Sequence, residues 1–224
     1  NVAVGRNTLD ANTTGTQNNA LGQSALGSNT SGNCNTSMGQ VSLFCNTIGN
    51  GNSAIGFNSL YSNTSADFNV AVGRQAMYTN STGERNVAMG LNAMYSNTTG
   101  YTNTAIGLSS LRNNTVGNYN FGGGYSALGK NETGSLNVAL GYQAGNGGSV
   151  GNSDVNYNIF IGPQAGNDVL TGANYNTVIG YQAGDAVSTG ANNIILGALS
   201  AQNLTTGSDN IIIGYDLDAG SATG

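Results

Sequence analysis

Four aromatic residues, Phe44, Tyr61, Tyr78 and Tyr95, follow one another at equal intervals along the sequence. In a fold that stacks equal positions, they would form a ladder of rings. Exposed rings can stack on sugar rings, whereas buried rings pack between chains. The sequence therefore leaves two hypotheses for this ladder, glycan contact and inter-chain packing, and we favour packing.

Residues for catalysis or metal binding are sparse. The chain of 224 residues contains no His and ten acidic residues. It shows no nucleophile elbow and no local carboxylate cluster, so we assign no catalytic residue and expect no enzyme, cofactor or metal. A calcium site needs six or more oxygens around one point. We therefore interpret the acidic residues of the C-terminal part as a solvated edge: Asp154, Asp168, Asp185, Asp209, Asp216 and Asp218.

The two cysteines, Cys34 and Cys45, lie within the length of one repeat. One disulfide and two free thiols both remain open. A zinc site is not expected from two Cys without a His.

The dominant feature of the chain is a repeat in which an Asn is followed four residues later by a Gly. A fixed period of this kind is typical of a solenoid. It predicts a single solenoid of thirteen repeats over residues 1–224, regular over 1–136 and looser, with insertions, over 137–224. The Asn residues are 1, 18, 35, 52, 69, 86, 103, 120, 137, 158, 176, 193 and 210.

Each repeat can be read from its Asn, taken as position zero. Positions one to three are small, β-branched or apolar and predict a strand that ends at the Gly of position four. Position eight is Leu or Met in the first eight repeats and predicts a second short strand, followed by an Asn-Thr-Gly turn. Stacking such units gives an all-β fold, a parallel β-solenoid or β-roll with 17-residue coils.

The two faces of the first strand carry information about assembly. Positions one and three point one way and position two the other. Because no charged residue occupies these positions, we expect one face to line the coil and the other to pack on a partner chain, with Ala at position two allowing close approach. The alternative is a thick monomeric coil that buries both faces internally. In the last repeats position two grows, as in Phe160, while position eight shrinks, as in Gly166. Constant packing density then predicts that the two columns share one buried space.

The interval between Asn137 and Asn158 is longer than the regular interval of the preceding repeats. Gly-Gly-Ser and Asn-Ser-Asp within it are typical of a loop. We expect a loop near residues 146–157, with the strand register preserved on either side.

Two segments, Asn52-Ser53-Ala54-Ile55-Gly56 and Asn103-Thr104-Ala105-Ile106-Gly107, resemble the head repeat of trimeric autotransporter adhesins. With Ala-Leu and Asn-Thr-Thr-Gly added, the unit also resembles repeats of phage and algal-virus tail fibres. The resemblance implies a left-handed β-roll, a homotrimer, and a fibre or adhesin that binds a host-surface glycan or protein receptor. The setting would be extracellular, at a cell surface or on a virion. The adhesin repeat is usually shorter than the repeat of this chain, so this coil should be wider.

Charge and hydropathy exclude other partners. Five scattered basic residues make no footprint for nucleic acid. No run of about 20 apolar residues is present, so no membrane insertion by this segment is expected. Since the pattern runs to both ends of the sequence, we expect a fragment of a longer protein.

Several Asn residues of the turns precede x-Ser/Thr and are candidates for N-glycosylation, although turn chemistry alone produces such matches. Two other functions remain as alternatives. An ice-binding solenoid would use a flat Thr array, whereas the Thr residues lie mainly at turns. A polysaccharide-degrading β-helix would need a groove with carboxylates. The candidate glycosylation residues are Asn12, Asn29, Asn63, Asn80, Asn97 and Asn131.

Overall fold

The computed structural model describes residues 1–147 and 154–218. The chain is an all-β parallel β-solenoid with 17-residue coils in its regular part, and the described residues contain no helix. It divides into two compact units, Asn1–Ser109 and Ser110–Gly224. Each unit is a stack of coils that carry one strand apiece.

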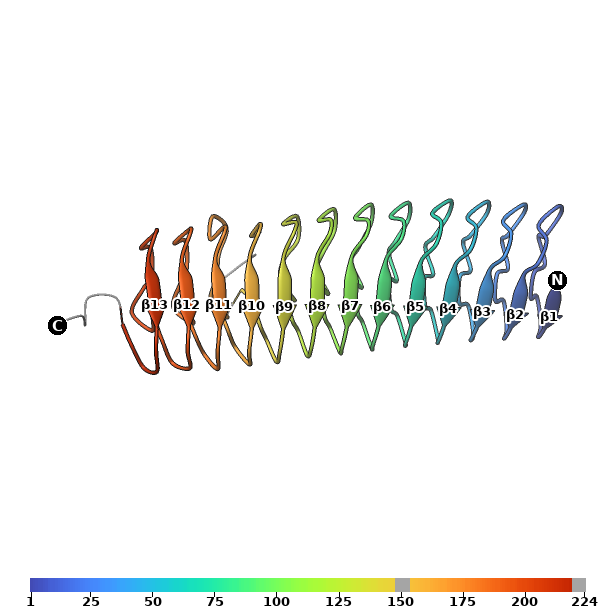
Figure 1. Ribbon diagram of the computed structural model, residues 1–224. Helices are drawn as coiled ribbons and strands as arrows, with labels where there is room; N and C mark the ends of the chain where they lie inside the picture. The colour runs from blue at the N-terminus through green and yellow to red at the C-terminus, as the bar shows by residue number, and fades with distance from the viewer. Residues whose placement is uncertain (148–153, 219–224) are drawn as a thin grey trace. The chain divides into compact units, whose positions relative to one another are not determined.

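The first unit contains seven three-residue strands, which pair in parallel and in sequence order (Figure 1). Their register places equal repeat positions opposite each other, so that Ala54 pairs with Ala71 and Ile55 with Val72. Every strand lies in a predicted Asn-to-Gly segment, which confirms those strands. They are β1 (Val2–Val4), β2 (Asn19–Leu21), β3 (Thr36–Met38), β4 (Ser53–Ile55), β5 (Val70–Val72), β6 (Val87–Met89) and β7 (Thr104–Ile106).

The second unit continues the pattern with six strands. The register is kept across the longer interval, since Phe160 pairs with Ala139, as predicted. The predicted loop at 146–157 includes residues 148–153, which lie outside the described residues. The strands are β8 (Phe121–Gly123), β9 (Val138–Leu140), β10 (Ile159–Ile161), β11 (Thr177–Ile179), β12 (Ile194–Leu196) and β13 (Ile211–Ile213).

The Gly that ends each strand is required by the close stacking of the coils. Gly56 has a φ of 130°, a backbone conformation that residues with a side chain rarely adopt. A Cβ at this position would lie 2.6 Å from the carbonyl oxygen of Gly73 in the next coil. A larger residue would therefore force the coils apart.

The predicted second strand is wrong for the described coils. Its residues form turns in which Asn58 and Leu60 have φ values of 56° and 50°. Alternating left-handed residues cannot run as an extended strand. The backbone bonds to the next coil instead, for example from Leu60 N–H to the Ala76 carbonyl at 2.9 Å. These inter-coil bonds offset the cost of the unusual conformation.

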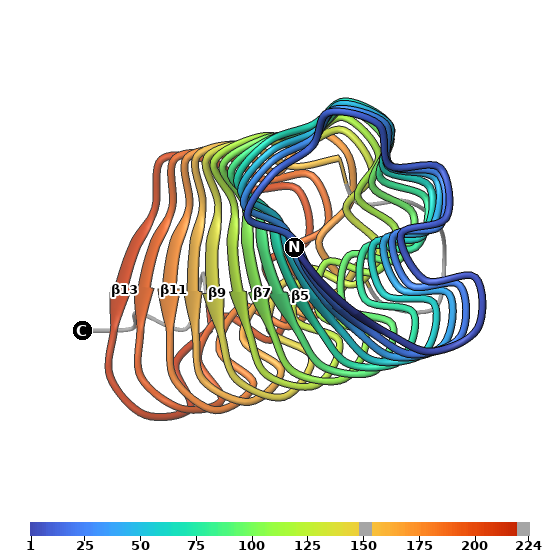
Figure 2. The same cartoon turned by 90° about the vertical axis from the view of Figure 1, so that its right-hand side faces the viewer.

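In the coils between the first and the last, positions two and eight lie in the core. Ala71 and Leu60 are both 0% exposed, and Figure 2 shows the strands of each unit along one side of its coils. The expectation that the Ala face meets a partner chain is therefore wrong: the pleat turns Ala inward, and positions one and three face outward. The predicted sharing of space is confirmed, because Phe160 lies against Gly145 and Gly166.

Two ladders of buried Asn side chains join the coils. At position zero, Asn52 Oδ1 accepts from Asn69 N–H at 3.0 Å, and Asn52 Nδ2 donates to Ala66 O at 2.8 Å. At the corner, Asn63 Nδ2 donates to Asn46 Oδ1 at 2.7 Å. Each buried amide thus replaces water for backbone groups that the turns leave unpaired.

Candidate interaction surfaces

The outer strand face, defined here as the side chains at positions one and three, is a broad apolar surface. In the first unit Val4 is 54% exposed, Ile55 41% and Ile106 44%. In the second unit Leu140, Ile194 and Leu196 continue the pattern. Uncharged columns of large exposed side chains are uncommon on a free surface and mark interaction sites.

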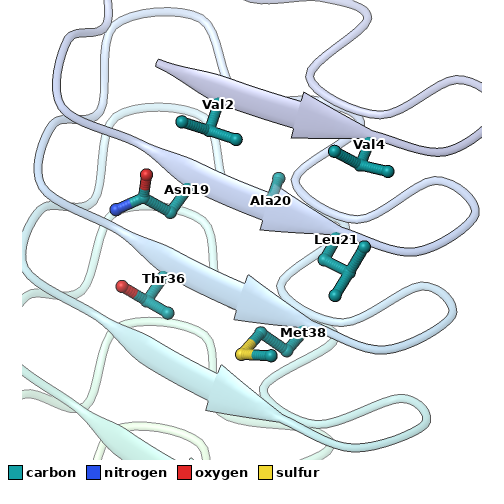
Figure 3. Close-up of a pocket in the computed structure, with 7 residues that line it drawn as sticks. All are labelled: Val2, Val4, Asn19, Ala20, Leu21, Thr36 and Met38. Atoms are coloured by element: carbon teal, nitrogen blue, oxygen red, sulfur yellow. The ribbon is translucent and has the colours of Figure 1, made fainter.

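Figure 3 shows this face at β1–β3, where Val2, Val4, Leu21 and Met38 surround a shallow depression of about 220 Å³. Thr36 and Asn19 add polar groups at position one. None of the residues that line the depression is charged, so it is suited to packing rather than to chemistry.

The aromatic ladder lies on another side of the coil and is half-buried. Ring centroids are 5.6 Å apart between Phe44 and Tyr61, 5.2 Å between Tyr61 and Tyr78, and 5.3 Å between Tyr78 and Tyr95. The planes of these pairs differ by at most 16°. Each ring therefore covers the face of its neighbour. The rings thus pack between successive coils of one chain, which leaves less free ring face for stacking on sugars. Packing of the ladder against another chain stays a prediction.

The two cysteines are free and are separated by the architecture. Cys34 is exposed and its Sγ lies 3.0 Å from Gln17 Oε1. Cys45 lies beside the aromatic ladder, where burial raises the pKa of its thiol and a hydrogen bond with Tyr61 opposes that rise. Burial, followed by the charges of Cys45 and Tyr78, also raises the pKa of Tyr61. The free-thiol alternative is the one that the structure contains.

The candidate glycosylation residues belong to the corner Asn ladder. Asn29, Asn63, Asn80, Asn97 and Asn131 are 0% exposed, and Asn12 is half-buried. Asn63 Nδ2 already donates to Asn46 Oδ1 and to Ala66 O. A glycan on such a nitrogen would remove a donor hydrogen and would have no space. The folded ladder is thus incompatible with glycosylation at these buried nitrogens.

The corner Thr hydroxyls also bond within the solenoid. Thr13, Thr30 and Thr47 each donate from Oγ1 to a backbone carbonyl of the next coil, at 2.9–3.0 Å. Their hydroxyl hydrogens are thus used in hydrogen bonds between stacked coils. This use weakens the ice-binding alternative, which needs a Thr array free to order water.

Carboxylates of adjacent coils interact at Asp168 and Asp185. The pKa of Asp185 is raised, first by desolvation and then by the charge of Asp168, while a hydrogen bond from Asn167 lowers it. Within residues 1–147 and 154–218, no group of three or more His, Cys, Asp and Glu side chains is arranged to hold a metal ion. Nor does this part of the chain contain a helix with the length and apolarity needed to cross a membrane.

A second depression, of about 280 Å³, lies at the corner of two coils in the first unit. Its lining residues are Thr82, Glu84, Arg85, Thr99 and Tyr101. Sequence reasoning missed this site. The signal was a departure from the repeat at position fifteen, where Glu84 and Tyr101 replace the short polar residues of the preceding coils.

Comparison with known proteins does not assign the chain. No family model, no curated protein and no solved structure matches it.

Proposed function

We propose that this chain is the rod-forming repeat segment of a homotrimeric adhesive fibre, extracellular or on a virion, with left-handed coils and no enzymatic activity. The observation that carries the proposal is the outer strand face, where Ile55, Met89 and Ile106 are each 41–44% exposed. Burying such columns against other chains removes apolar surface from water, which stabilises by about 25 cal/mol per Å².

A copy of the same chain is the partner that fits this face best. The columns repeat once per coil, so a surface with the same spacing can contact every row in register. Since none of the positions one to three is charged, like-charge repulsion does not oppose self-association. The resemblance to adhesin heads and tail fibres supports three chains and a role in adhesion.

The Asn ladders support a mechanical role. A buried amide that bonds three neighbours, as Asn52 does with Asn35, Ala66 and Asn69, resists sliding of one coil over another. A rod built in this way would hold a recognition surface at a fixed distance from its anchor.

The proposal is tested by the mass of the protein in solution, measured by light scattering after size exclusion. We expect three times the chain mass of 22.5 kDa. Replacing Met89 and Ile106 by Asp together should produce monomers, because burying two carboxylates in an apolar interface is costly. The matched control carries Asp at the exposed corner residues Thr14 and Thr189 and should remain trimeric. A monomeric wild-type protein would overturn the proposal.

A further inference from the structure

The depression is lined by Glu84 and Tyr101, which occupy position fifteen of their repeats. In the preceding coils, position fifteen bonds the backbone of its neighbour: Thr16 N–H donates to Asn33 Oδ1, and Asn33 N–H to Asn50 Oδ1, at 2.8 and 2.9 Å. Asp67 Oδ1 accepts from Asn50 N–H in the same way. Ser135 has the same role in the second unit, where its Oγ accepts from Asn118 N–H.

Glu84 and Tyr101 occupy the next two steps of this column with longer side chains that line an open depression. The carboxylate of Glu84 lies 3.4 Å from the guanidinium of Arg85, and both side chains are partly exposed. Tyr101 is 40% exposed. At position fifteen of these two repeats, a charged and an aromatic side chain therefore stand in place of the short polar residues of the preceding coils.

The walls of the depression are held rigidly. Gly83, between Thr82 and Glu84, accepts at its carbonyl from Asn69 and Asn80 Nδ2, both at 2.9 Å. Gly100, between Thr99 and Tyr101, accepts from Asn86 and Asn97 Nδ2 at 2.8 and 2.9 Å. A site built on such backbone loses little conformational entropy when a ligand binds.

From this arrangement we infer that the depression formed by Thr82, Glu84, Arg85, Thr99 and Tyr101 binds a neutral pyranose sugar. The exposed part of Tyr101, which lines the depression, offers apolar surface to the C–H face of a sugar. The Glu84 carboxylate accepts from vicinal hydroxyls, while Arg85 donates and the two Thr hydroxyls can do either. The close Glu84–Arg85 pair offsets its own charges, which favours a neutral sugar over an acidic one.

The size of the depression sets the extent of the ligand. The volume is about 280 Å³. Pockets for drug-sized ligands are slightly larger and begin at about 300 Å³. One sugar unit fits such a space, with the rest of a glycan in solvent. None of the lining residues belongs to the outer strand face, so the inference specifies the receptor of the proposed adhesive function without requiring the face used for assembly.

The test uses saturation-transfer NMR on the full chain with methyl β-galactoside, methyl β-glucoside and methyl α-mannoside at millimolar concentration. We expect transfer to at least one glycoside. Tyr101→Ala should weaken its binding about tenfold, the upper range for loss of one aromatic contact. Tyr101→Phe should retain binding, and Glu84→Gln should weaken it. Tyr181→Ala, at a half-exposed tyrosine outside the depression, is the matched control and should have no effect.

Absence of transfer to all three glycosides would overturn the inference. So would equal binding by wild type and Tyr101→Ala, or equal losses in Tyr101→Ala and Tyr181→Ala. The melting temperature and the solution mass of every variant are measured in parallel. A monomer that still binds the sugar would refute the trimeric fibre and keep this site, whereas a trimer without binding would refute only the site.

Discussion

The ring of Phe160 fills the space beside Gly145, at the position where the first eight repeats have Leu or Met. A Cβ on Gly145 would lie 2.5 Å from Phe160 Cδ2. The backbone itself would accept Leu, because Gly145 has a φ of 58° and Leu26, at the equivalent position, has a φ of 50°. In the repeat of Phe160 the large core residue thus stands at position two, whereas in the first eight repeats it stands at position eight.

This exchange predicts strong coupling between the two positions. Phe160→Ala should cost about 3–5 kcal/mol through the cavity it leaves. Gly145→Leu should cost about 1–3 kcal/mol through overpacking. The double variant should be more stable than the sum predicts, by about 1–3 kcal/mol. Denaturant unfolding measures the cycle, and Gly184→Leu combined with Phe160→Ala is the control, because the contacts of Gly184 are with Val178 and Ile195.

The Asn ladder should dominate the stability of a coil. Asn52→Ala removes three hydrogen-bonding partners of a side chain that is 0% exposed. It leaves the Asn69 N–H buried without its acceptor, at about 1–3 kcal/mol, while the Ala66 carbonyl keeps the hydrogen bond from Asn63 Nδ2. We expect a marked fall in the melting temperature. Thr14→Ala, at an exposed corner, should change it little, and equal effects would contradict the structural role of the ladder.

Asp185 should make stability depend on pH. Its folded-state pKa is raised by desolvation and by Asp168, so the folded state favours the protonated form. The stability that this provides is present below the unfolded pKa and is lost as pH rises through the folded pKa. Asp185→Asn should therefore melt higher than wild type at neutral pH, with the difference vanishing in acid. A difference that grows in acid would contradict the assignment, and Asp209→Asn, an exposed site, is the control.

The two faces of one strand should respond differently to the same charge. Ala71→Arg places a cation inside the coil, where Ala71 is 0% exposed, and should unfold or strongly destabilise the protein. Ile55→Arg on the outer strand face should preserve the circular dichroism spectrum and act on association alone. If Ala71→Arg folded normally and only its oligomeric mass in solution decreased, the inward placement of position two would be refuted.

The repeat alone determined where the strands lie, because an Asn that bonds its copy in the next coil and a Gly that permits close stacking must recur at one spacing. In one repeat, Asn52 is the residue that bonds its copies in neighbouring coils, and Gly56 is the residue that permits close stacking. The exchange between Phe160 and the small residues at position eight was also readable, since two columns that change size together must share a volume.

Only the tertiary structure decided which face of the strand is inside. The alternation of Ala54 and Ile55 is symmetrical in the sequence. Ala54 is the buried residue, and the large buried side chain of this repeat is Leu60 at position eight. The left-handed backbone conformation of Leu60 and its neighbours could likewise not be predicted from the sequence, because inter-coil hydrogen bonds, and not local propensity, stabilise it. The depression at Tyr101 exists only because stacking brings Glu84 and Tyr101, which lie one repeat apart in the sequence, into adjacent coils.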